Sequence, residues 1–204
     1  NMNYAAVDAG GNAVVKVEVP AEWANIVVKE EEHTADAARP DFVKKIVDPI
    51  NALKGDLLPV SAFNGREDGT WDNGTAAYEK RGIAVNVPEW KIGNCIQCNQ
   101  CAYVCPHAVI RPFLATEEEA AASGVEWKQG LGETKEYKFR IQISPMDCTG
   151  CSNCVDVCPA KDKALVMRPL EEQMPQQKNW DYITKNIGYK QVVDKTKSVK
   201  NLQL

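Results

Sequence analysis

Short runs of alternating apolar and polar residues predict several strands in this chain. The run Ala13–Val19 places three valines on one side and Lys16 and Glu18 on the other, as in a strand with one buried face. Gly10-Gly11 predicts a turn before it, and Tyr4–Val7 favours a short helix or strand. The same reasoning predicts strands over residues 82–88, 107–113, 137–143 and 164–167.

Helical spacing is confined to two places. Between residues 41 and 58, apolar side chains recur every three or four positions, as on one face of a helix. Pro49 is expected to kink or split this helix, and Gly55 to cap its C-terminal end. The pattern Thr-Glu-Glu-Glu from residue 116 is a capping box and predicts a second helix to about residue 123.

One cysteine pattern occurs twice and organises the prediction. It reads Cys-x2-Cys-x2-Cys-x3-Cys-Pro, which is the bacterial signature of [4Fe–4S] clusters. Eight thiolates supply two four-iron clusters, and the two copies use all eight cysteines of the chain. The first copy consists of Cys95, Cys98, Cys101, Cys105 and Pro106, and the second of Cys148, Cys151, Cys154, Cys158 and Pro159.

The spacing also predicts which cysteines share a cluster. The third and fourth cysteines of a copy are four residues apart, so a short helix can direct one thiolate to each of two clusters. In two-cluster ferredoxins the fourth cysteine binds the other cluster. We therefore expect cluster A from Cys95, Cys98, Cys101 and Cys158, and cluster B from Cys148, Cys151, Cys154 and Cys105.

Disulfides and structural zinc are the two other uses that such cysteines can have. Disulfides fit an even number of cysteines, but no secretory signal opens this charged chain. Structural zinc usually uses two separated Cys-x2-Cys pairs, whereas here four cysteines lie within eleven residues and a proline follows. Both alternatives therefore rank far below iron–sulfur clusters.

The order of elements predicts an α+β fold. A strand, a cluster loop and a second strand occur twice, which indicates the pseudo-twofold arrangement of bacterial two-[4Fe–4S] ferredoxins. The segment 114–136 is an inserted excursion between the two halves. Residues 171–204 are polar and weakly patterned, and we expect a C-terminal arm there.

Composition narrows the functional classes. The 204 residues are 44% hydrophobic and carry a net charge of −4, which gives no reason to expect nucleic acid. No apolar run approaches the roughly 20 residues of a membrane helix, so we expect a cytoplasmic protein. Residues 171–204 hold six lysines and four acids, which indicates a solvated surface, with docking to an acidic redox partner as a weaker option.

The clusters are expected to carry electrons, because every iron would have a cysteine ligand and none would be open to substrate. No thiamine diphosphate, dinucleotide or Walker motif is present, so no catalytic residue is assigned. Gly150 is expected to let backbone amides approach cluster B. His107 is interpreted as a partly buried structural residue, with a hydrogen bond near cluster B as the alternative.

Beyond its cysteines, the chain resembles pyruvate:ferredoxin (flavodoxin) oxidoreductase from about residue 40 to residue 170. The lead-in segment before the first cysteine takes part in this resemblance, which a generic ferredoxin would not share. The stretches that carry it are Leu58–Phe63, Glu79–Trp90, Asn94–His107, Asp147–Lys161 and Lys163–Met167.

The resemblance implies a large, usually homodimeric enzyme that converts pyruvate and coenzyme A to acetyl-CoA and CO₂. It implies thiamine diphosphate, Mg²⁺ and a third [4Fe–4S] cluster elsewhere in the parent, with ferredoxin or flavodoxin as electron acceptor. This chain, which begins Asn1-Met2-Asn3, would then be a piece of a longer polypeptide. Its implied parts are the end of a preceding domain (1–28), a small mixed α/β linker domain (29–90) and the two-cluster domain (91–170).

Two further interpretations remain open at this stage. The chain is alternatively an autonomous ferredoxin-like carrier, or a subunit of another 2-oxoacid oxidoreductase. Continuation of the coding frame past Leu204 into a thiamine-binding domain would favour the pyruvate enzyme.

Overall fold

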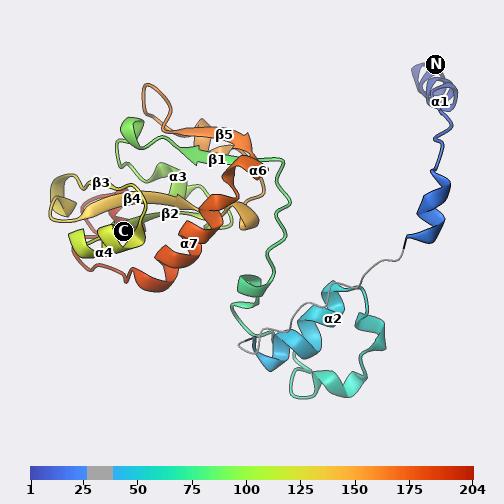
Figure 1. The fold of residues 1–204 in the computed structure, drawn as a ribbon, viewed down its shortest axis with the longest axis horizontal. Helices are drawn as coiled ribbons and strands as arrows, with labels where there is room; N and C mark the ends of the chain where they lie inside the picture. The colour runs from blue at the N-terminus through green and yellow to red at the C-terminus, as the bar shows by residue number, and fades with distance from the viewer. Residues whose placement is uncertain (27–38) are drawn as a thin grey trace. The chain divides into compact units, whose positions relative to one another are not determined.

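The computed structural model describes residues 1–26 and 39–204, which form two compact units, Asn1–Trp71 and Asp72–Leu204 (Figure 1). Residues 29–38 of the linker domain implied by the resemblance lie outside the described residues.

The first unit begins with helix α1 (Met2–Asn12), so the turn predicted at Gly10-Gly11 is wrong. The strand predicted over Ala13–Val19 is also wrong, because residues 14–19 have no regular secondary structure and belong to neither sheet of the described residues. Its four valines are all exposed. Alternation indicates a strand only where a second strand lies beside it. The short helix η1 (Ala21–Asn25) follows.

The helix predicted between residues 41 and 58 forms, but it ends early. A π-helical turn, η2 (Val43–Val47), leads directly into α2 (Asp48–Asn51). Pro49 has no N–H to donate, and a wider turn before it accommodates the missing hydrogen bond without a break. Val43, Ile46 and Val47 are buried, whereas Leu53 is exposed. The helix is capped at Ala52, and Gly55 begins η3 (Gly55–Leu57). The unit closes with η4 (Val60–Phe63).

The second unit contains two antiparallel sheets that are related by the internal repeat. Strand β1 (Asn86–Trp90) pairs with β5 (Leu165–Pro169), so that the residues before the first motif lie beside those after the second. Strand β2 (Ile110–Ala115) pairs with β4 (Lys138–Ile143), so that the residues after the first motif lie beside those before the second. The short strand β3 (Lys128–Gln129) lies on the other edge of β4. Figure 1 shows both pairs.

In the second unit the predicted strands form, but their first and last residues differ from the prediction. The strands expected near 107–113, 137–143 and 164–167 appear as β2, β4 and β5. The strand expected over 82–88 begins only at Asn86, and Ile83 and Val85 are exposed instead of facing the core. The predicted capping box is confirmed, since Thr116 and Glu119 cap helix α4 (Glu117–Ser123) reciprocally.

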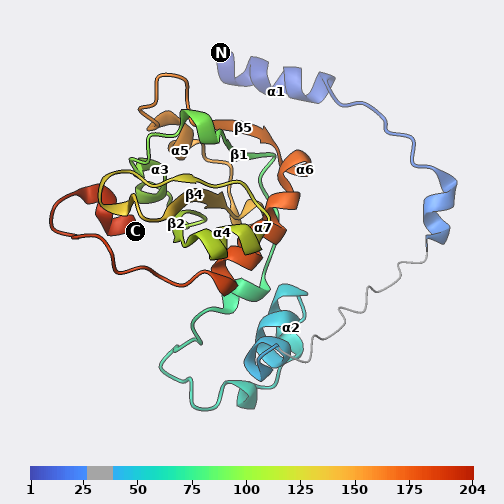
Figure 2. The same cartoon turned by 60° about the vertical axis from the view of Figure 1, so that its left-hand side comes forward.

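Residues 170–204 correct the prediction of a weakly structured arm. They form α6 (Leu170–Gln173) and α7 (Pro175–Asn186), and α7 packs against β4 and α4 (Figure 2). Ile183 of α7 is fully buried with Ala115 and Ala120. The chain ends in η9 (Val199–Gln203), and Leu204 joins the main core.

That core gathers residues of both sheets and of the second motif. Its buried members are Ile110, Leu114, Phe139, Ile141, Ile143, Cys154, Leu165 and Leu204. Four short helices of this unit lie in loops: η5 (Thr75–Tyr78), η6 (Ile92–Asn94), η7 (Gly132–Thr134) and η8 (Pro145–Asp147). Among the described helices, none has the length and apolar character to cross a bilayer.

Candidate metal centre

The two cysteine motifs fold in the same way. Each follows a single helical turn, η6 or η8, and each carries its third cysteine on or beside a four-residue helix, α3 (Gln100–Tyr103) or α5 (Asn153–Asp156). The residues two after the first cysteine, Gln97 and Gly150, have φ of 59° and 71°. Asn99 and Ser152, which follow the second cysteines, have φ of 60° and 65°. These left-handed positions curl each loop back on itself.

The fourth cysteine of each motif lies with the other motif. Cys105 lines one small cavity together with Cys148, Cys151 and Cys154. On the other side, Cys95 packs against the buried cluster that contains Cys158.

The two cysteine groups are neighbours. Cys101 lies close enough to Cys95, Cys98 and Cys154 for their charges to interact. Contact between α3 and α5 holds the two motifs together. The arrangement favours the crossed ligation expected from the sequence, which stays a prediction.

All eight cysteine side chains are available as donors, and it is their sequence spacing that indicates iron–sulfur clusters. All eight cysteines are free, so no disulfide joins them. Within the described residues, no three or more Cys, His, Asp or Glu side chains converge on a point that would hold a single ion.

The buried thiols resist ionisation in the absence of a cation. Burial, with added repulsion from neighbouring cysteines, raises the pKa of Cys154 to about 12. The same causes, burial first, raise the pKa of Cys101 and of Cys148. Because metals bind thiolates, loading must release these protons. The thiolate forms of these cysteines become stable only when a positively charged group lies among the sulfurs.

Backbone amides reach sulfur in both groups. The N–H of Gly150 donates to Cys148 Sγ at 3.4 Å, and the N–H of Ala164 donates to Cys158 Sγ at 3.4 Å. A side chain on Gly150 would place its Cβ 2.9 Å from the carbonyl oxygen of Asn86. Glycine is therefore required here by both its positive φ and this close approach.

Two buried polar residues of the first motif escaped the sequence analysis. Gln97 donates through Nε2 to the carbonyl of Gln129 and accepts from the N–H of Leu131. Asn99 donates through Nδ2 to the carbonyl of Lys200 at 2.9 Å. Nothing in the local sequence indicates that these two side chains hydrogen-bond to the backbone of segments far away along the chain.

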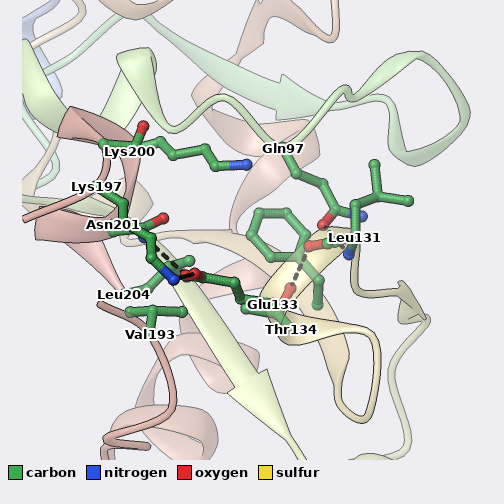
Figure 3. A pocket seen from close by; sticks show the side chains of 12 residues that line it. Gln97, Leu131, Glu133, Thr134, Val193, Lys197, Lys200, Asn201 and Leu204 are labelled. Atoms are coloured by element: carbon green, nitrogen blue, oxygen red, sulfur yellow. Dashed lines mark hydrogen bonds and ion pairs between the residues drawn. The ribbon is translucent and has the colours of Figure 1, made fainter. Parts of the chain in front are cut away.

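A cavity of about 230 Å³ lies where these segments meet (Figure 3). Gln97 lines it from the first motif, and Glu133 lines it from the segment between the motifs. Glu133 pairs with Lys197 at 2.7 Å and accepts from Asn201 at 3.0 Å. The C-terminal residues thus close over the first motif.

Three isoleucines are buried beside a cysteine of the second motif, whereas His107 is not buried as predicted. Ile110, Ile141 and Ile143 are buried in one cluster with Cys154. His107 is exposed, at the edge of the cavity lined by Cys105, so it is not a partly buried structural residue.

Comparison with known proteins agrees with this geometry. A 4Fe-4S dicluster domain matches residues 94–161, and a domain of unknown function matches residues 28–84. The pyruvate:ferredoxin oxidoreductase of Moorella thermoacetica is 54% identical over 175 residues, covering 84% of this chain and 15% of that protein. The chain matches one segment of the pyruvate:ferredoxin oxidoreductases. The resemblance inferred from the sequence is confirmed.

The other relatives differ in the electron acceptor that their names give. The pyruvate-flavodoxin oxidoreductase of Enterobacter agglomerans is 50% identical over 184 residues, which cover 89% of this chain and 15% of that protein. The mitochondrial pyruvate dehydrogenase [NADP(+)] of Euglena gracilis is 43% identical over 189 residues, covering 90% of this chain and 10% of that protein. The chain spans about 15% or less of the length of these three relatives.

Proposed function

We propose that this chain is the two-cluster electron-transfer segment of a pyruvate:ferredoxin oxidoreductase. It binds two [4Fe–4S] clusters and passes electrons from a thiamine site elsewhere in the parent to ferredoxin or flavodoxin. The observation that carries the proposal is the placement of Cys105 among the cysteines of the second motif. The similarity of most of the chain to pyruvate oxidoreductases supports the choice of parent.

The residues of this chain have three tasks in that role. The cysteines hold the clusters in crossed sets, with Cys95, Cys98, Cys101 and Cys158 on cluster A and Cys148, Cys151, Cys154 and Cys105 on cluster B. Bound there, the clusters supply one-electron transfer. The N–H groups of Gly150 and Ala164 donate to ligand sulfurs, which stabilises the added negative charge. Ile110, Ile141 and Ile143 keep water from the sulfurs.

Several features of the parent follow from the same proposal. Thiamine diphosphate, Mg²⁺ and a third [4Fe–4S] cluster lie outside this chain, in an enzyme that is a homodimer of the cytoplasm. Eight free cysteines are consistent with a reducing compartment. Residues 29–90 are its linker domain, and the segment 114–136 is an excursion inserted into the ferredoxin-like fold.

The runner-up is a separate ferredoxin-like carrier, or a subunit of an enzyme for another 2-oxo acid. The similarity extends over 84% of this chain in the Moorella protein and beyond the dicluster domain, which favours the fused pyruvate enzyme. The alternative predicts a chain that exchanges electrons with a purified oxidoreductase. The main proposal predicts pyruvate-dependent reduction of both clusters only in the full-length parent.

Paired cysteine substitutions test the ligand sets. Cys98→Ala with Cys158→Ala removes two ligands of one cluster under crossed ligation, so about four irons should remain per chain. Cys98→Ala with Cys105→Ala removes one ligand from each cluster, so both should be damaged. Iron analysis and EPR after dithionite reduction distinguish the two. The reverse outcome would show uncrossed sets, and zinc without iron would refute the electron-transfer proposal.

A further inference from the structure

Two lysines contact the backbone of cluster ligands. Lys128 donates through Nζ to the carbonyl of Cys95 at 2.7 Å and to that of Ile92 at 2.9 Å. Lys163 donates to the carbonyls of Cys158, Val155 and Asp156 at 2.8, 3.0 and 3.0 Å. Each ammonium group thus donates a hydrogen bond to the backbone carbonyl of a cysteine assigned to cluster A.

These two positive charges are not neutralised by nearby carboxylates. Within the described part of the chain, neither Lys128 nor Lys163 forms an ion pair with an acidic side chain. Lys128 is half-buried and Lys163 is exposed. All three N–H groups of Lys163 are used on carbonyls, which fixes its position despite its exposure.

The surroundings of the second cysteine group are closer to neutral. Lys80 approaches Asp147, the residue before Cys148, and the two form an ion pair. Arg111 donates to the carbonyl of Ala108, which is not a ligand, and its guanidinium lies 5.1 Å from the ring centroid of Trp180. No described lysine donates to a carbonyl of the four cysteines assigned to cluster B.

The N–H···S bonds do not create this difference. One such bond is present in each group, from Gly150 to Cys148 and from Ala164 to Cys158, both at 3.4 Å. The lysine charges are therefore what distinguishes the groups. A nearby positive charge favours the reduced cluster, which carries one more negative charge.

We propose that Lys128 and Lys163 together raise the reduction potential of cluster A above that of cluster B. The inference rests on the proposed function and also on crossed ligation. Cys95 and Cys158 belong to different motifs, so only the crossed sets bring both lysines to one cluster. Uncrossed sets would give one lysine to each cluster. Cluster A is then where an electron resides after one-electron reduction.

The test is a redox titration of the whole chain with both clusters assembled, followed by EPR. Lys128→Gln and Lys163→Gln keep an amide donor for the carbonyls and remove the charge. Each should lower the reduction equilibrium constant of the same cluster by about three- to tenfold, more for half-buried Lys128. The double variant should lower it further. Cys98→Ala identifies the affected step, because it disrupts cluster A.

Matched controls separate charge from structure. Lys135→Gln and Lys161→Gln remove exposed lysines from the same two segments and should leave both potentials unchanged. Lys163→Arg keeps the charge and should keep the potential even if the chain is less stable. Shifts in two different steps, or shifts no larger than the controls, would overturn the inference. A sample with zinc and no iron would give no titration step, which marks failure of the proposed function instead.

Discussion

The side-chain amide of Asn99 donates a hydrogen bond to the backbone carbonyl of Lys200, 2.9 Å away, and so ties the first motif to the end of the chain. Asn99 is 2% exposed. Loss of a buried hydrogen bond that leaves its partner unsatisfied costs about 1–3 kcal/mol. The contact therefore connects the stability of the C-terminal segment to that of the first motif.

Asn99→Gly should lower the free energy of unfolding by about 1–3 kcal/mol, because glycine accepts the positive φ but cannot donate to Lys200. The first motif should also release iron faster to a chelator. Ser152→Gly is the matched control, since Ser152 occupies the equivalent position with φ of 65°. Denaturant titration and the loss of cluster absorbance measure both effects. Equal behaviour of the two variants would contradict a specific role for the tie to Lys200.

Gly150→Ala should be strongly destabilising. The new Cβ would lie 2.9 Å from the carbonyl oxygen of Asn86, and alanine at φ of 71° is strained. We expect a loss of about 1–3 kcal/mol in unfolding free energy and a weaker N–H contact to Cys148. Gly93→Ala is the control, because nothing lies within 4 Å of its added Cβ. If both variants unfold at the same denaturant concentration, the requirement for glycine is refuted.

Helix α7 should behave as part of the core. Ile183 is fully buried, so Ile183→Ala should cost about 2–5 kcal/mol through lost contacts and the cavity left behind. Lys185→Ala, on the exposed side of the same helix, should change stability by less than about 0.5 kcal/mol. Thermal unfolding of both variants gives the comparison. A small effect of Ile183→Ala would indicate that α7 is dispensable.

The iron-free chain should lose stability in alkaline solution. The Cys154 thiol has its pKa raised from 9.0 to about 12 by burial, so the unfolded chain loses this proton first. Stability from the neutral thiol is complete below pH 9 and is lost as the pH rises toward 12. The slope is about 1.4 kcal/mol per pH unit for one such thiol.

Denaturant titrations between pH 8 and pH 11, with a reducing agent present, would measure this slope. Cys154→Ser removes one of the three thiols with a raised pKa and should make the slope shallower, while Cys101 and Cys148 keep the remainder. A wild-type stability that stays constant over this range would show that Cys154 is not buried as described.

Local patterns predicted those parts of the fold that local interactions decide. The capping box at Thr116 needs only residues within four positions, and it forms as expected. The alternation of apolar residues over 137–143 predicted β4. The strand forms there because β2 and β3 pair with its two edges. The valines of 13–19 show the same alternation, but a strand there would need a second strand to pair with, and none lies beside it in the described residues.

The sequence predicted the cysteine ligands of the candidate site, but it did not predict the residues that hold the cysteine loops in place. The cysteines and their spacing are sufficient to indicate a [4Fe–4S] cluster, because four thiolates within eleven residues and a following proline form the known signature. The roles of Gln97 and Asn99 depend on segments more than thirty residues away along the chain. Helix α7 was missed for a related reason, since few of its side chains face the core.

The pairing of β1 with β5 and of β2 with β4 has a consequence for biosynthesis. When the first motif leaves the ribosome, neither the strand that pairs with β1 nor the thiolate of Cys158 has yet been made. Under the crossed ligation proposed above, cluster A cannot be completed during early synthesis, and iron delivery waits until the second motif has emerged. The nascent first half then carries four unligated thiols through that interval, and thiols without a ligand can be oxidised or bind another metal.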